Sequence, residues 1–196
     1  MFSDPAPNND NLPVLAEVSV EQGRLILLNV MIDKDLPAII QFLKKEYTPK
    51  GDLNAAIEGF KEMFSSFAGS LKSHAFVVRL GEEILFEIEL HLAELHFPYR
   101  RDFTPEEKDY YMVVLGGGFE LADFTVYVRG LQLCLDYFGN SLGVQQILAQ
   151  VDEGPNKLLQ FRLFSEAGMT MPLGVTNPER PDLFVFSRPD TPHTAS

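Results

Sequence analysis

Apolar and polar residues alternate along this chain in two rhythms, which predict short strands and amphipathic helices. Several runs have the length and β-branched content of strands, and other segments repeat apolar residues three and four apart, as helices with one buried face do. The predicted strands are 24–31, 74–80, 84–94, 110–115, 144–151 and 183–187. The predicted helices are 36–46, 52–70, 123–138 and 156–166.

The order of these elements predicts fold class α/β (α+β), with a mixed, twisted central sheet and helices on both faces. A tight turn at Gly81 and Glu82 joins 74–80 and 84–94 into a hairpin. The helix 123–138 is a crossover, so 110–115 and 144–151 should be parallel and should diverge at one end. The strand 183–187 is expected to pair with 170–175.

One domain is predicted over residues 14–188. Residues 1–13 are polar and rich in Pro and Asn, and 189–196 are similar in character, so both are predicted to be flexible tails. The 196 residues are enough to bury a full core without disulfides or metals.

The charge of the chain limits the classes of partner that it can be expected to bind. A formal net charge of −12 argues against nucleic acid and against an anionic membrane, since both require a basic face. No apolar run approaches the roughly 18 residues of a membrane span, so a cytoplasmic location is expected. The single cysteine, Cys134, excludes an intrachain disulfide and a cysteine-built zinc site, and its apolar helical surroundings predict an inert core thiol.

The strand 86–94, FEIELHLAE, carries the most promising ionisable residues. Strand alternation places Glu87, Glu89 and His91 on one face and apolar residues on the other. Two interpretations remain open. The three groups act on a substrate, as a base or as a binding site for a cation, or they lie on an ordinary solvent-facing surface. No zinc-protease helix, nucleophile elbow or Walker loop is present in the sequence.

The last third of the chain resembles a known family. After the helix 123–138 come the phrases LDYFGNSLGV, at 135–144, and LFSEAGM, at 163–169. This order resembles the back half of a GCN5-related N-acetyltransferase, and the resemblance extends over residues 24–187. It implies an acyl-coenzyme A held between two splayed strands, with the amides of Val113 to Leu115 polarising the acyl carbonyl.

The resemblance also shows where this chain departs from the family. The pyrophosphate loop, Arg/Gln-x-x-Gly-x-Gly/Ala, falls at 122–127, which reads ADFTVY and contains no Gly and no Arg. Asp123 would cap the helix there and compete with a phosphate for the same N–H groups. The triplet Gly116, Gly117 and Gly118 offers other amides, although such a triplet also marks an ordinary turn.

The family's proton donor is absent too. Phe164 occupies the position of the Tyr that protonates the departing thiolate in many members, and Asn156 lies one residue out of register with the Asn that opens the helix. Asn156 remains a candidate as a ligand or as a simple helix cap.

The resemblance therefore implies an enzyme that transfers an acyl group from acetyl-coenzyme A or another acyl-coenzyme A to a small-molecule or peptide amine, without a metal. The alternative is an inactive binding or assembly module of the same fold, and a homodimer is left open. The predicted catalytic residues are Glu87, Glu89 and His91. The predicted coenzyme-binding residues are Val113, Leu115, Gly116, Gly117, Gly118, Asp123, Phe124, Asn156 and Phe164.

Overall fold

The structure is a computed structural model, and the part of it that can be described comprises residues 14–29, 37, 39–41, 44, 53–67, 73–92, 109–115, 124–151, 157–170 and 183–187. The predicted tails, 1–13 and 189–196, lie outside these residues.

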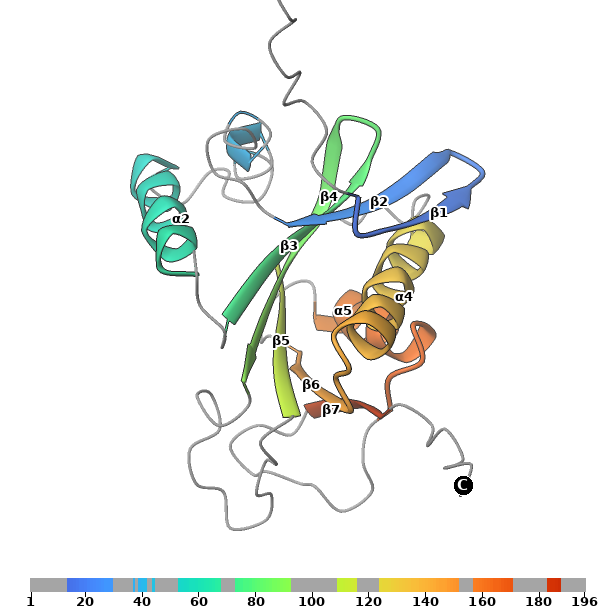
Figure 1. Ribbon diagram of the computed structural model, residues 1–196. Helices are drawn as coiled ribbons and strands as arrows, with labels where there is room; N and C mark the ends of the chain where they lie inside the picture. Colours follow the sequence, from blue (N-terminus) through green and yellow to red (C-terminus); the bar gives the residue numbers. More distant parts are fainter. Residues whose placement is uncertain are drawn as a thin grey trace, which may run out of the picture.

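In the described part of the chain, seven strands form a single sheet whose spatial order follows the order of the chain (Figure 1). The strands are β1 (Ala16–Val20), β2 (Gly23–Asn29), β3 (Ser73–Leu80), β4 (Glu83–Leu92), β5 (Asp109–Leu115), β6 (Gln146–Gln150) and β7 (Leu183–Ser187). Neighbouring strands are antiparallel except β5 and β6, which are parallel. The predicted mixed sheet and its parallel pair are confirmed.

The parallel pair separates before β5 ends. The register runs from Asp109 opposite Gln146 to Met112 opposite Ala149. Beyond Met112, β5 continues to Leu115, and there its recorded strand partner is β4 alone. The parallel pairing thus ends before the carboxyl end of β5, as the predicted divergence of the two strands requires.

One detail of the sheet differs from the prediction. The strand β1 was not predicted, because its five residues, AEVSV, are half polar and only partly buried. A two-residue turn joins it to β2 at one edge of the sheet. The strand β7 pairs antiparallel with β6 over all five residues, and the expected pairing of 183–187 with 170–175 stays a prediction. Residues 171–175 lie outside the described part of the chain.

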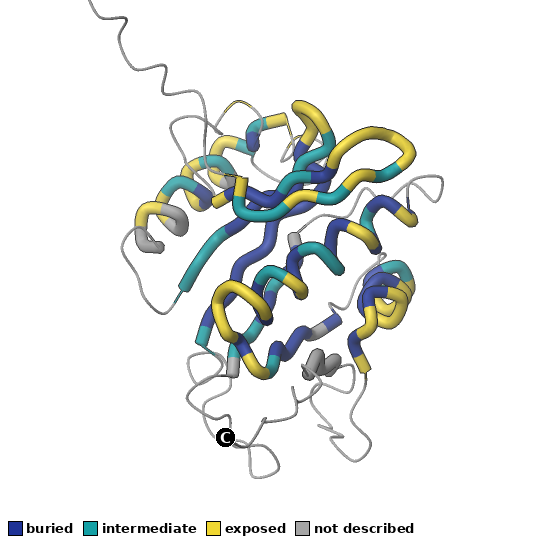
Figure 2. Tube along the Cα trace, turned by 45° about the vertical axis from the view of Figure 1, so that its right-hand side comes forward, coloured by how far each residue is buried: buried dark blue, intermediate teal, exposed yellow. Residues whose placement is uncertain are grey.

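The predicted helices are found within a few residues of their expected bounds. They are α2 (Leu53–Phe67), α4 (Phe124–Ser141) and α5 (Lys157–Glu166), and the residues described between 37 and 44 are helical as well. Figures 1 and 2 show α4 on one side of the sheet and α2 on the other, beside β3. Helices therefore cover both faces, as predicted.

The main core lies between α4 and the sheet. Gly130 allows the closest approach, because a Cβ at that position would lie 3.0 Å from Cζ of Phe86 and 3.2 Å from Cγ1 of Val78. Cys134 lies in this core with no exposed surface, which confirms its predicted core position, and burial raises the pKa of its thiol. None of the described helices is long and apolar enough to cross a membrane.

Candidate functional site

A row of ionisable side chains lies buried along β4. Glu87, Glu89 and His91 alternate with Phe86, Ile88 and Leu90, which belong to the core under α4, so the row lies on the opposite face. The three residues are 2%, 7% and 5% exposed. The predicted shared face is confirmed, and the interpretation as a solvent-facing surface is wrong.

The neighbouring strands explain why this face is covered. Glu87 pairs with Val77 on β3 and with Leu115 on β5, and Glu89 pairs with Ala75 and Val113. These partners are apolar, and an apolar sheet surface is normally buried against another layer. Glu87 and Glu89 are thus ionisable residues set among apolar cross-strand partners.

His91 is held by two hydrogen bonds. Its Nε2 lies 2.9 Å from Oε2 of Glu89, and its Nδ1 lies 2.9 Å from Oγ of Ser73 on the adjacent strand. A neutral imidazole satisfies both contacts if Nε2–H donates to the carboxylate and Nδ1 accepts from the serine hydroxyl. Ser73, His91 and Glu89 therefore form one continuous chain.

Glu87 has a different environment. Both of its carboxyl oxygens are buried, and none of the described residues forms a hydrogen bond with them, in contrast to the chain at His91. Burial, and then the nearby charge of Glu89, raise the pKa of Glu87 well above its usual range. A buried carboxyl that lacks donors favours its neutral form and attracts a positive group that could neutralise it.

The row therefore divides into two sites. Glu87 lies opposite Leu115, where β5 has parted from β6, whereas His91 lies opposite Tyr111, within the paired segment. Four residues of strand separate these positions, which is roughly 13 Å at about 3.3 Å per residue. Of the three predicted catalytic residues, Glu87 and Glu89 lie opposite the end of β5 that no longer pairs with β6, and His91 does not.

The predicted coenzyme-binding residues are partly described. Val113 is half-buried opposite Glu89, and Leu115 ends β5. Phe124 begins α4 and is 3% exposed, and the guanidinium of Arg162 lies 4.2 Å from the centre of its ring. Phe164 is 1% exposed within the core. The remaining predicted coenzyme-binding residues, Gly116, Gly117, Gly118, Asp123 and Asn156, lie outside the described residues.

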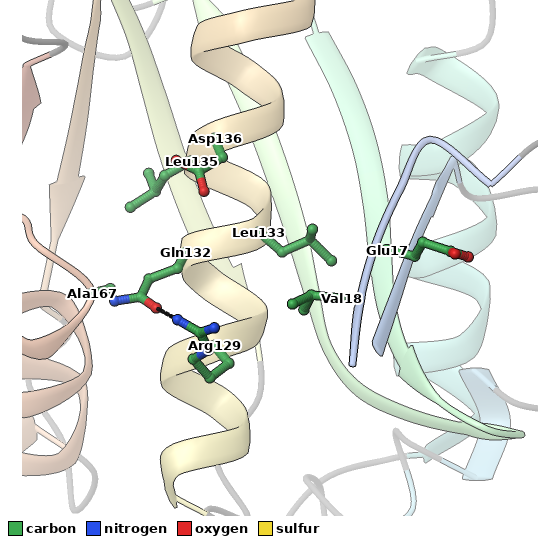
Figure 3. Close-up of a pocket in the computed structure, with 8 residues that line it drawn as sticks. All are labelled: Glu17, Val18, Arg129, Gln132, Leu133, Leu135, Asp136 and Ala167. Carbon is green, nitrogen blue, oxygen red and sulfur yellow. Dashed lines mark hydrogen bonds between the residues drawn. The ribbon is translucent and has the colours of Figure 1, made fainter. Parts of the chain in front are cut away.

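A separate groove of about 420 Å³ runs between β1 and α4. Figure 3 shows Arg129, Gln132 and Asp136 of α4 along it, with a hydrogen bond from Arg129 Nη1 to Gln132 Oε1, and Glu17 on the β1 side. No predicted site residue lines this groove. It therefore adds no support to the predicted site.

Ser73 is the site residue that the sequence analysis missed. Counting outward from the turn at Gly81 and Glu82 would place Ser73 opposite Leu90. A β-bulge at Leu85 shifts the register by one, from Arg79 opposite Ile84 to Val78 opposite Phe86, and thereby brings Ser73 opposite His91. A bulge of this kind has no sequence signal in the hairpin.

No protein-family model and no curated protein matches the sequence. The structure is similar to an aminoglycoside acetyltransferase, AAC(6')-Ib, solved with coenzyme A and kanamycin, at a TM-score of 0.61 and 16% identity over 84% of this chain and 95% of that one.

Two further solved structures are similar over most of their length. Mycobacterium smegmatis RimJ, in complex with CoA-disulfide, has a TM-score of 0.60 and 11% identity over 87% of this chain and 85% of that one. An uncharacterised protein of Bacillus halodurans has a TM-score of 0.61 and 16% identity over 89% and 91% of the two chains. The strand order, the parallel pair of β5 and β6 and these similarities agree, and the chain has the fold of the GCN5-related N-acetyltransferases.

Proposed function

We propose that this protein is an N-acyltransferase that moves an acyl group from an acyl-coenzyme A to an amine. The observation that carries the proposal is the position of Glu87, which is buried without a hydrogen-bond partner among the described residues and lies opposite Leu115, in the part of β5 beyond its last pair with β6. In this fold the divergence is where a thioester would be held. A buried carboxyl at that point suits an amine acceptor, which arrives with a positive charge.

The residues of the chain fit this chemistry on the acceptor side. The coenzyme, when bound, supplies an acyl group activated as a thioester. An ammonium group beside Glu87 would lower the pKa of that carboxyl, since an opposite charge favours the ionised form. The resulting carboxylate can take a proton from the amine, which frees its lone pair for attack. Glu89 adds a second negative charge to the same strand and strengthens this preference for a cation.

The donor side is assigned to the end of β5. The amides of Val113 to Leu115 are proposed to polarise the acyl carbonyl, by resemblance to the family. Positioning of this kind supplies most of the rate enhancement when two reactants are held together. Phe164 carries no exchangeable proton, so the thiolate is expected to be protonated by water.

Coenzyme binding is the first test. Acetyl-coenzyme A at 100 times its dissociation constant should stabilise the protein by about 2.7 kcal/mol, measured as a rise in melting temperature. Release of free thiol in the presence of a panel of primary amines then tests transfer. Glu87→Gln should lower turnover while preserving coenzyme binding, and Glu62→Gln, an exposed residue of α2, is the matched control.

A second candidate is a binding or assembly module that has lost the coenzyme site. The observation that favours it is the complete burial of Phe124, Val126 and Phe164, which fill space near the helix start and at the proton-donor position. Unchanged melting temperatures with millimolar acetyl-coenzyme A and with free coenzyme A would support this module and reject the transferase.

A further inference from the structure

The hydrogen-bonded chain of Ser73, His91 and Glu89 is not required by the proposed transferase. Its geometry is that of an activated nucleophile: a hydroxyl within 2.9 Å of an imidazole, whose other nitrogen lies 2.9 Å from a carboxylate. We propose that these three residues form a second reactive site, in which the hydroxyl of Ser73 takes the acyl group of a carboxylic ester and passes it to water.

The proposed reaction has two balanced steps. In the first, Oγ of Ser73 bonds to the ester carbonyl carbon, its proton moves to Nδ1 of His91, and that proton passes to the departing alkoxide, which leaves as an alcohol. In the second, water attacks the acyl-serine, His91 takes a proton from the water and returns one to Oγ, and a carboxylic acid is released. No oxidant, metal or other cofactor enters either step.

Each residue is positioned for its role by regular strand structure. Ser73 and His91 are direct cross-strand neighbours on β3 and β4, and Glu89 lies two residues from His91 on the same face. Ser73 is half-buried and so more open to a reagent than His91 and Glu89, which are buried. In this arrangement Ser73 is the nucleophile, His91 the base, and Glu89 a positioning residue that fixes the tautomer of His91.

Two further observations support a role distinct from simple packing. The bulge at Leu85 is what aligns Ser73 with His91, so the contact depends on a local departure from regular pairing. In addition, the raised pKa of Glu87 favours its neutral form, which leaves Glu89 as the negative neighbour for a developing imidazolium.

The test is covalent labelling of the full-length protein. A fluorophosphonate should add to Ser73, identified by peptide mass spectrometry, and p-nitrophenyl acetate should be hydrolysed through an acetyl-Ser73 intermediate. Ser73→Ala should abolish both signals. His91→Gln should slow labelling by at least about 100-fold, as loss of a general base does. Ser65→Ala, an exposed serine of α2 whose Oγ donates to the carbonyl of Lys61, is the matched control and should label normally.

Glu89→Gln tests the positioning role separately. It should lower kcat for the ester by about tenfold or more and leave KM unchanged, since the substituted side chain does not contact the ester. Circular dichroism and a thermal melt on each variant establish that it is folded. If His91→Gln does not fold, the decision rests on Ser73→Ala, whose change is confined to one half-buried oxygen.

Several results would overturn the proposal. These are a folded wild type that gives no adduct at Ser73, labelling that persists at the same rate in His91→Gln, or an equal loss of labelling in Ser65→Ala. The stabilisation by acetyl-coenzyme A is measured in parallel on the wild type and on Ser73→Ala. Because the ester assay needs no coenzyme, failure of the transferase and failure of this second site give different patterns.

Discussion

Glu87 is the residue whose environment has the clearest consequence for stability. The folded protein holds its proton more tightly than the unfolded chain, for which the usual pKa is 4.5. The stability contributed by the protonated carboxyl is complete below that value. As the pH rises above it, the unfolded chain releases the proton first, so the free energy of unfolding falls until the raised pKa of the folded state is passed.

We therefore expect Glu87→Gln to remove this pH dependence. The free energy of unfolding of the variant minus that of the wild type should increase as the pH is raised from about 4.5 towards neutral. Denaturant melts across this range provide the measurement, and Glu62→Gln, which changes an exposed carboxyl, serves as the control. A difference that stays constant with pH would contradict the raised pKa of Glu87.

Phe164 provides a second prediction at this scale. Its side chain is 1% exposed in the core, so Phe164→Ala should destabilise the protein by about 3–5 kcal/mol. Phe161 lies one turn earlier on the same helix and is 37% exposed, so Phe161→Ala should cost much less. Equal losses in urea melts of the two variants would show that Phe164 does not fill the core.

The sequence predicted which residues share the polar face of β4, but not that the face is buried. Strand alternation is enough to align Glu87, Glu89 and His91. Their burial depends on apolar partners such as Val77 and Val113 on neighbouring strands. The pattern of apolar and polar residues does not reveal which residues of those strands lie opposite β4. The contact of His91 with Ser73 depends further on one inserted residue, Leu85. This contact could therefore not be predicted from the sequence alone.

At the scale of elements, the packing of α4 on the sheet depends on a glycine. A methyl group at position 130 would meet Phe86 and Val78 at 3.0–3.2 Å, closer than an ordinary contact. Gly130→Ala gains roughly 1 kcal/mol of helix propensity, but it overpacks a core where such insertions cost about 1–3 kcal/mol. Phe86 is completely buried and has little room to move, so we expect a net loss of stability.

Gly59 offers a matched comparison within α2. A Cβ there would have no neighbour within 4 Å, so Gly59→Ala should stabilise the protein by about 0.5–1 kcal/mol through helix propensity alone. Opposite signs of the two changes in thermal melts are the expected result. A stabilising Gly130→Ala would mean that α4 lies further from β4 than the structure places it.

The elements themselves were predicted well where burial is strong and poorly where it is weak. The helices 52–70 and 123–138 carry long apolar stripes, and the structure places α2 and α4 within three residues of those bounds. The strand β1 has only Val18 and Val20 as large apolar residues. It lies at the edge of the described sheet, where β2 is its one neighbouring strand. Its pattern is too weak to separate from a polar loop.

At the scale of the whole molecule, the net charge of −12 should affect the binding of the two substrates of the proposed transferase in opposite ways. Coenzyme A is a polyanion and is repelled, whereas a cationic amine is attracted. Raising the salt concentration from about 10 to about 150 mM shortens the screening length from roughly 30 to 8 Å. As the salt concentration rises, we expect the affinity for coenzyme A to increase and the affinity for the cationic amine to decrease. Calorimetry at several salt concentrations measures both affinities.

A coenzyme affinity that falls as salt rises would contradict this expectation. It would indicate that a local positive group outweighs the charge of the molecule as a whole, such as Arg162 of α5, whose guanidinium lies over the ring of Phe124 at the start of α4. A neutral amine analogue, whose affinity should not change with salt, is the control for the second substrate.

The agreement between sheet order and chain order also bears on how the protein folds. The hairpins β1–β2 and β3–β4 are closed by two-residue turns, so each can form as soon as it leaves the ribosome. The parallel contact of β5 with β6 must wait for the whole of α4, and closing that longer loop is slower. We therefore expect the amino-terminal half to act as the template on which the crossover unit, with the proposed coenzyme site, is assembled last.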